Sequence, residues 1–176
     1  MLICLKKYLF LCDIMSELKE LIEKFIELDD DLNEKIEQHL ETADDIDEEF
    51  EKEHEDQISE MGEIYHEIEH EVFNEEFIIV FNQSGEEKEV VALIISDEDD
   101  EDEEFVIPVF TDDEEAQTAI AEFKEQFGDI EFKCETKVGS EIVADHSEDD
   151  DFVGLAINAP QWDFVVARED VHDCSE

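Results

Sequence analysis

The hydrophobic residues between Leu18 and Val72 recur with the period of an α-helix. At about 100° per residue, all of them fall within about 60° of one direction. They are Leu18, Ile22, Phe25, Leu32, Ile36, Leu40, Ala43, Ile46, Phe50, Ile58, Met61, Ile64, Ile68 and Val72. The stripe predicts helix throughout this stretch. Because its period is about 3.6 residues, it does not require a left-handed supercoil, so a helical hairpin or a helix lying on a domain competes with a coiled-coil dimer.

Two stretches inside this region favour helix ends, and we therefore expect two or three helices. Residues 29–34 include three Asp that can cap a new helix. Residues 41–49 offer Thr42, Asp44 or Asp45 as N-cap residues.

The pattern changes to short β-rich runs after residue 76. Residues 77–82 and 89–96 read as a hairpin with Gly85 in the loop, and a charged loop follows at 97–104. Residues 105–110 are a third strand, in which Pro108 indicates an edge or a bulge. Further strands are expected at 130–136, 152–158 and 163–167, and helices at 111–128 and 139–146.

The helix at 111–128 has clear end signals, with Thr111 and Glu114 as a capping box and Gly128 at its end. The elements together predict an α+β fold. We expect about five strands in a mixed or antiparallel sheet with packed helices, preceded by a long acidic helical extension. The expected divisions are a leader at 1–14, the extension at 15–75 and the α+β domain at 76–176.

Charge restricts the possible partners. The chain has 58 acidic and 11 basic residues, for a formal charge of −47, so nucleic acid and anionic membranes would be repelled. Basic proteins, or self-association through the helical stripe, are the expected partners. Since 41 % of residues are hydrophobic, including 13 Phe, a folded core is expected despite the charge. Adaptation to a salt-rich cytoplasm is another explanation of the acidity.

Cysteine usage favours a reducing, cytoplasmic location. Cys4, Cys12, Cys134 and Cys174 form no C-x-x-C pair, which argues against a disulfide framework or a Cys-type zinc site. Residues 1–14 lack the long apolar run and cleavage site of a signal peptide, and Met15 opens a sensible helix, so they are expected to be an over-long start or a leader.

The stretch His66-Glu67-Ile68-Glu69-His70 matches the H-E-x-x-H pattern of zinc peptidases. On the helix, both histidines lie opposite the apolar stripe, whereas a catalytic zinc site needs an enclosed cavity and ordered supporting partners. In a helix so rich in Glu the match is interpreted as fortuitous, and His66, Glu67 and His70 are only weak metal candidates. We expect no enzyme activity and no cofactor. His54 falls on the apolar face and is interpreted as a polar gap in the packing.

Three other features of the sequence are candidate sites. The acidic run at 96–104 lacks the central Gly and ligand alternation of an EF-hand calcium loop. Arg168, the only arginine, is expected to pair with a defined carboxylate pair and hold the last strand. Trp162, the only tryptophan, would mark a binding surface if exposed.

Two segments, FVIPVFTDDEEAQTAIAEF and GLAINAPQWDFVVARED, resemble the SseB N-terminal-domain family, named for the enhanced-serine-sensitivity protein. The resemblance covers about residues 77–172 and excludes the helical segment. It departs from the family where Ala159 separates Asn158 from Pro160. It implies an α+β module without established catalytic residues. Separately from the resemblance, Asn158, Trp162 and Arg168 are a candidate interaction surface.

The expected function is a non-enzymatic, cytoplasmic interaction or regulatory module with an SseB-like domain. One alternative is a nucleic-acid mimic, in which the ladder of acids on the helix occupies the basic groove of a DNA-binding protein. The other alternative is an H-E-x-x-H zinc hydrolase.

Overall fold

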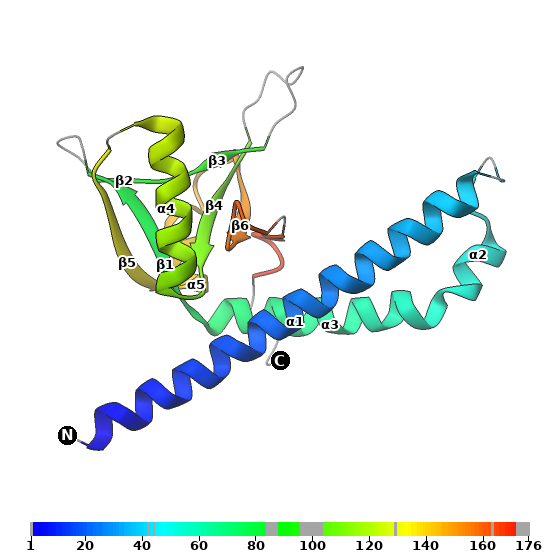
Figure 1. The fold of residues 1–176 in the computed structure, drawn as a ribbon, viewed down its shortest axis with the longest axis horizontal. Helices are drawn as coiled ribbons and strands as arrows, with labels where there is room; N and C mark the ends of the chain where they lie inside the picture. The colour runs from blue at the N-terminus through cyan, green and yellow to red at the C-terminus, as the bar shows by residue number, and fades with distance from the viewer. Residues whose placement is uncertain are drawn as a thin grey trace. The chain divides into compact units, whose positions relative to one another are not determined.

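A computed structural model describes residues 2–41, 43, 45–83, 88–95, 104–128, 130–162 and 164–171, and for residues 2–16 only the backbone. The chain forms two compact units, Met1–Ile68 and Glu69–Glu176. Among the described residues, five helices and a seven-stranded mixed sheet confirm the predicted α+β class (Figure 1). The loop around Gly85, most of the acidic loop at 97–104, and the cap candidates Thr42 and Asp44 lie outside the described residues.

The first unit is a helical hairpin. Its helices are α1 (Leu2–Leu40), α2 (Glu48–Glu53) and α3 (Glu55–Asn74), the last of which continues into the second unit. The rings of Phe25 and Tyr65 lie 5.7 Å apart, and further along α1 the Lys35 Nζ donates to Gln57 Oε1 at 2.7 Å. Since later residues of α1 meet earlier residues of α3, the two helices run antiparallel.

The apolar stripe supplies the buried side chains of these helices. Leu18, Ile22, Ile64, Ile68 and Val72 are all 5 % exposed or less. Other residues of the stripe are exposed, since Leu40 is 45 %, Ile46 37 % and Ile58 44 % exposed. The stripe is therefore buried over only part of its length.

The helix break predicted at 29–34 is wrong, because α1 continues through this stretch to Leu40. The Asp side chains bond forward along the helix instead of capping a new one: Asp29 accepts from Asn33 at 3.0 Å, and Asp31 from Lys35 at 2.6 Å. The chain does break within 41–49, where Asp47, and not Asp45, caps α2 by accepting from the backbone N–H groups of Glu49 and Phe50.

The second unit is built around a mixed sheet. Its strands are β1 (Glu76–Asn82), β2 (Glu89–Val90), β3 (Leu93–Ile94), β4 (Phe105–Phe110), β5 (Phe132–Val138), β6 (Phe152–Ile157) and β7 (Val165–Ala167). One path through the sheet runs β2-β1-β4-β6-β7; in addition, β5 pairs with β1 and β3 pairs with β4. The β4–β6 pair is parallel and the other pairs are antiparallel.

The run at 89–96 forms two short strands instead of the single strand predicted. β2 pairs with the end of β1, and β3 pairs with the start of β4. Because the described pairs between β1 and β4 are limited to Ile78–Phe110 and Ile79–Val109, the two strands diverge, and residues 89–95 cross the gap between them.

The edge position predicted from Pro108 is also wrong, because β4 pairs with β1 and β3 on one side and with β6 on the other. Among the described pairs, Pro108 falls between the part of β4 that pairs with β3 and the part that pairs with β1. A proline has no N–H to donate, and it is tolerated at this interruption of the ladder. The irregularity in the β4–β6 register lies at Phe105/Val106.

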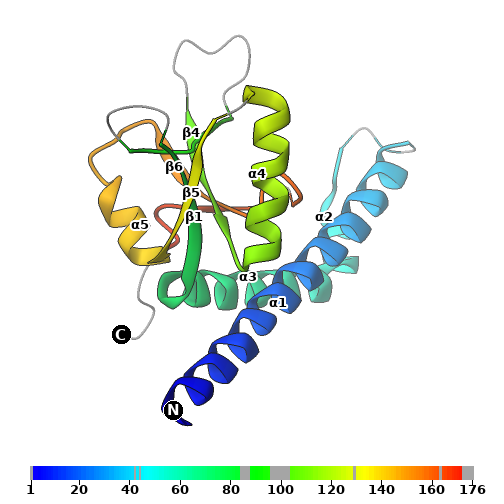
Figure 2. The ribbon, with the colours of Figure 1, turned by 60° about the vertical axis from the view of Figure 1, so that its left-hand side comes forward.

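Two helices cover opposite faces of the sheet (Figure 2). On one face, α4 (Asp113–Phe127) packs Ala116, Ala119, Ile120 and Phe123 with Val80 and Phe110. On the other face lies α5 (Gly139–Asp145). A Cβ at its first residue, Gly139, would lie 2.0 Å from the Val72 carbonyl oxygen, so this close approach requires glycine.

The predicted capping box at Thr111 and Glu114 is wrong. Asp112 is the N-cap of α4, and its Oδ1 accepts from the backbone N–H groups of Glu114 at 3.0 Å and Glu115 at 2.9 Å. The Thr111 hydroxyl is instead bonded to Asn158. The predicted helix end at Gly128 is confirmed, with φ of 85°.

Replacing Asp112 with alanine is expected to cost about 1 kcal/mol of stability, because two backbone donors lose their acceptor. Urea unfolding followed by circular dichroism measures the loss. Glu114→Ala is the matched control. The Glu114 side chain would contribute as much stability as the Asp112 side chain only if Thr111 and Glu114 formed a capping box.

Candidate functional site

The turn after β6 is held by a buried asparagine. Asn158 is 0 % exposed, has φ of 50° and precedes the cis peptide Ala159–Pro160. Its Oδ1 accepts from the Thr111 backbone N–H at 2.9 Å, and its Nδ2 donates to Thr111 Oγ1 at 3.0 Å. Its backbone N–H donates to the Val109 carbonyl at 2.8 Å. These bonds join the C-terminal ends of the parallel strands β4 and β6.

Asn158 itself is therefore not part of an exposed interaction surface, contrary to the sequence prediction. Its burial follows from its bonding, since both polar atoms of the amide have partners on Thr111. The residue acts on the surface indirectly. Its carbonyl oxygen accepts from the N–H groups of Gln161 at 3.0 Å and Trp162 at 3.2 Å, which positions the segment that carries Trp162.

Trp162 forms part of the wall of an apolar groove with a volume of about 280 Å³. Val106, Ala156, Ala159 and Phe164, each 5 % exposed or less, are its most buried lining residues. Other lining residues are Leu93, Ile94, Ile95, Pro160 and Val165. Ile94 is 63 % exposed, Ile95 45 % and Val165 37 %, so the wall presents large apolar side chains to solvent.

A more open hollow of about 740 Å³ adjoins the groove. It shares Leu93 and Pro160 with the groove and adds Glu122, Phe123, Glu125 and Gln126 from α4. The apolar surface therefore continues toward α4 and acquires carboxylates there.

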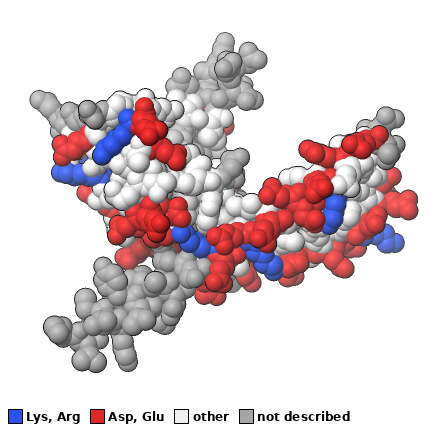
Figure 3. Space-filling model, viewed as in Figure 1, with Lys and Arg blue, Asp and Glu red and all other residues white. Residues whose placement is uncertain are grey.

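The sequence that follows the groove residue Ile95 is also acidic. The Ile95 N–H donates to the Glu104 carbonyl at 3.0 Å, and each of residues 97–103, between these two, is Asp or Glu. Acidic side chains also cover much of the visible surface of the helices in the first unit (Figure 3). The groove is thus an apolar site next to carboxylates of α4, in a chain of formal charge −47.

Arg168 does not line this groove. Its Nη1 donates to the Asp149 carbonyl at 2.9 Å, and its backbone N–H donates to the Val153 carbonyl at 2.8 Å. The described partner of the guanidinium is thus a main-chain oxygen, instead of the carboxylate pair predicted. Arg168 holds the end of β7 against the residues around the start of β6, which is the structural role the sequence suggested.

The H-E-x-x-H residues lie on the surface of α3. His66 and Glu67 are exposed, while Ile64 and Ile68 of the same helix are buried. His70 Nδ1 lies 3.7 Å from Oε1 of its neighbour Glu71. Within the described part of the chain, no three His, Cys, Asp or Glu side chains are grouped to hold a metal ion.

The composition of the groove determines its chemistry. None of its ten lining residues has an ionisable side chain, and Trp162 contributes one N–H donor. General acid–base or nucleophilic catalysis needs a titratable or nucleophilic group at the site. The groove is equipped to bind an apolar group.

The sequence pointed to Trp162 but missed the other walls of the groove. Residues 90–95 form a continuous apolar run, which is typical of a strand buried on both faces. The signal that could have revealed the groove is the acidic stretch at 97–104. Acidic residues so close to an apolar run indicate that the end of the run is near the solvent-exposed surface.

Comparison with known proteins gives no match: no family model, no curated protein and no solved structure is significantly similar to this chain. The resemblance to the SseB N-terminal-domain family therefore stays a prediction from its motifs. No helix in the described ranges is both long and apolar enough to cross a bilayer.

Proposed function

We propose that this protein is a non-enzymatic interaction module whose α+β domain binds a basic partner segment through the apolar groove. The observation that carries the proposal is the groove itself, which exposes Ile94, Ile95 and Val165 in a chain of net charge −47. Exposed apolar surface bordered by charge is characteristic of a docking site.

The two kinds of side chain have separate roles in this proposal. The groove takes one or two apolar side chains, each contributing about 1.5–3 kcal/mol when fully buried. The surrounding carboxylates, Glu104, Glu122 and Glu125 among them, attract Lys and Arg that flank these anchors and increase the association rate. Affinity should therefore fall as salt is added, because the charges lie at the surface.

The proposal includes the predicted SseB-like character of the domain, for which no catalytic residues are established. It also accords with a groove that lacks ionisable side chains and with histidines that lie on an exposed helix face. A cytoplasmic setting, in which the four thiols stay reduced, is part of the same proposal.

The only tryptophan allows a direct test. A synthetic peptide with a leucine anchor flanked by lysines is expected to shift Trp162 fluorescence to shorter wavelength, because the indole loses contact with water. Ile95→Asp should weaken this peptide's binding at least about tenfold, which corresponds to about 1.4 kcal/mol. Ile58→Asp is the matched control, since Ile58 is 44 % exposed and Ile95 45 %, but Ile58 lies on α3.

Equal binding by Ile95→Asp and the unsubstituted protein would contradict the use of the groove. Equal binding of a peptide with glutamates in place of the lysines would contradict the role of charge.

A nucleic-acid mimic is the second candidate, and the exposed acids on α3 favour it. Glu60, Glu63 and Glu67 repeat along one exposed region of this helix. A basic DNA-binding protein held by such a ladder would be displaced by DNA and by salt. Its binding would be unchanged in Ile95→Asp, which separates the two functions.

A further inference from the structure

The strand β5 lies at an edge of the sheet, with no described strand paired to its outer side. All seven of its residues pair with β1, from Glu76–Val138 to Asn82–Phe132, and the described pairings give it no partner on the other side. Four successive residues, Lys133, Cys134, Glu135 and Thr136, are exposed. A long uncovered edge is a template for a further strand unless its side chains prevent pairing.

The hydrogen bonds of β1 and β5 show which backbone groups lie on this edge. The Gln83 N–H donates to the Glu131 carbonyl at 2.8 Å, and the Gly139 N–H donates to the Glu75 carbonyl at 2.9 Å. Since bonded and non-bonded pairs alternate in an antiparallel ladder, Lys133, Glu135 and Lys137 also bond to β1. The N–H and C=O groups of Phe132, Cys134 and Thr136 therefore point away from β1.

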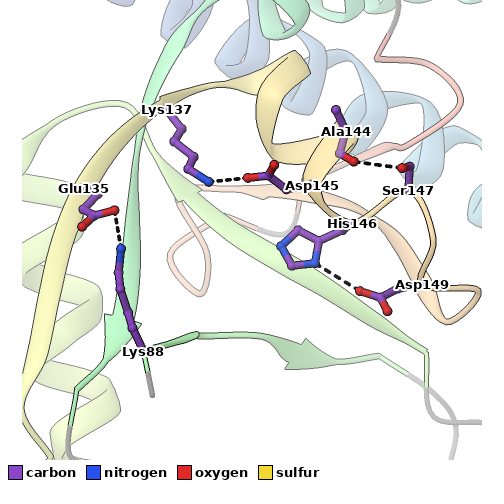
Figure 4. A network of polar contacts seen from close by, with 8 residues as sticks. All are labelled: Lys88, Glu135, Lys137, Ala144, Asp145, His146, Ser147 and Asp149. Carbon is purple, nitrogen blue, oxygen red and sulfur yellow. Dashed lines mark hydrogen bonds and ion pairs between the residues drawn. The ribbon is translucent and has the colours of Figure 1, made fainter. Parts of the chain in front are cut away.

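The side chains of this segment alternate in charge on one face of the strand. Glu131, Lys133, Glu135 and Lys137 are separated by two residues each, so they share a face. Two of them are already held there, since Glu135 pairs with Lys88 and Lys137 with Asp145 (Figure 4). With two Glu and two Lys, the segment 131–137 is neutral in a chain of 58 acids and 11 bases.

We propose that β5 pairs antiparallel with β5 of a second copy of this chain, with Cys134 opposite Cys134. In this register Lys133 lies opposite Glu135 and Glu131 lies opposite Lys137. By symmetry, each of these opposite-charge pairs occurs twice. The outward backbone groups of Phe132 meet those of Thr136, so the two sheets join into one.

Charge pairing favours this register over the two registers that are shifted by two residues. Moving one strand by two residues in one direction places Lys133 opposite Lys133 and Glu131 opposite Glu135. Moving it in the other direction places Glu135 opposite Glu135 and Lys133 opposite Lys137. Like charges directly opposite each other on a sheet are unfavourable, so both shifts are disfavoured.

Cross-linking of Cys134 in one copy to Cys134 in the other can detect this register. Directly opposed residues have Cα atoms about 5.5 Å apart in a hydrogen-bonded pair, within reach of a short cross-linker. Desolvation, followed by the Asp113 carboxylate, raises the pKa of the Cys134 thiol, so the reaction is run under mildly alkaline conditions to supply thiolate.

The test uses the full chain with Cys4, Cys12 and Cys174 replaced by serine, and a short bis-maleimide. A covalent dimer whose yield rises with protein concentration is expected. Sedimentation of the uncross-linked protein should show the same dependence. A yield that is independent of concentration, or no dimer at all, would overturn the proposal.

Charge-reversed variants test the register. Lys133→Glu with Lys137→Glu, and separately Glu131→Lys with Glu135→Lys, are each expected to lower the homodimer yield about tenfold. Mixing the two variants should restore cross-linking as a heterodimer, identified by mass. Glu122→Lys with Glu125→Lys on α4 is the control for net charge. Homodimer yields that are unchanged in the first two variants, or changed equally in the control, would refute the pairing.

A third variant tests the backbone edge. Thr136→Pro removes an outward N–H and leaves the bonds to β1 in place, so the circular dichroism spectrum should be unchanged while the dimer is lost. A dimer that persists in this variant would exclude pairing through the β5 edge.

Discussion

Replacing Asn158 with alanine is expected to lower the free energy of unfolding by roughly 3 kcal/mol. The Thr111 N–H, now bonded to Asn158 Oδ1 at 2.9 Å, would be left without an acceptor in a residue that is 3 % exposed. An unsatisfied buried donor costs about 1–3 kcal/mol. Alanine would also have to adopt the φ of 50° that asparagine tolerates, which costs about 1–2 kcal/mol.

A double-mutant cycle with Thr111→Val measures the interaction. Valine removes the hydroxyl but keeps the backbone N–H, so it should cost less than Asn158→Ala. A positive coupling between the two replacements is expected because they share hydrogen bonds. Additive effects in urea unfolding would show that the pair is not the link between β4 and β6.

The same replacement should alter the groove. Asn158 accepts hydrogen bonds from the backbone of Gln161 and Trp162, so a relaxed turn changes the position of the indole. Trp162 fluorescence in the folded Asn158→Ala variant is expected to differ from that of the unsubstituted protein.

Replacing Glu75 with glutamine is expected to stabilise the protein, by up to about 3 kcal/mol above pH 7. Glu75 is 5 % exposed, and within the described structure its Oε1 has no hydrogen-bond partner. Burial, and then the nearby Glu71 carboxylate, raise the pKa of Glu75 to about 7. The charged form is thus costly in the folded protein.

The sign of the pH dependence follows from this pKa. The folded state holds the Glu75 proton up to about pH 7, whereas the unfolded chain releases it near its ordinary pKa of 4.5. The contribution of Glu75 to the free energy of unfolding is therefore fully present below about pH 4.5. It decreases as the pH rises and is lost once the pH has passed about 7.

Urea unfolding at two pH values tests this expectation. The advantage of Glu75→Gln over the unsubstituted protein should grow by about 2 kcal/mol between about pH 5.5 and pH 8. Glu89→Gln, which removes an exposed carboxylate from β2, is the control for the loss of one negative charge, and its effect on stability should be smaller than that of Glu75→Gln. An equal advantage of Glu75→Gln at both pH values would mean that Glu75 titrates as an exposed carboxyl group.

Elements with strong local signals were predicted well from the sequence. The helix that ends at Gly128 and the strands around 130–136 and 152–158 were found close to their observed bounds. Local predictions were wrong where one residue type occurs in more than one structural role, such as capping a helix or bonding along it. The three Asp at 29–31 favour a cap by type, yet in α1 Asp29 and Asp31 bond to residues four positions later.

The candidate site was predicted only in part, because it is made by long-range packing. The sequence singles out Trp162, but its exposure depends on strands that are distant in the sequence. Ile94, Ile95 and Val165 look like core residues in sequence, and each belongs to a run that the sheet leaves partly uncovered. From the sequence, Asn158 is expected to be a polar residue at the surface. In the structure it is buried, because Thr111, 47 positions earlier, supplies its hydrogen-bond partners.

The sequence by itself determined the α+β class, the helical character of residues 18–72 and the negative field, because periodicity and charge are local or summed properties. Only the tertiary structure decided what covers the apolar stripe, which side chains form the groove and which strand edge stays open. These depend on how β1 and β4 diverge and on which residues distant in sequence meet, and neither is encoded in any single stretch of the chain.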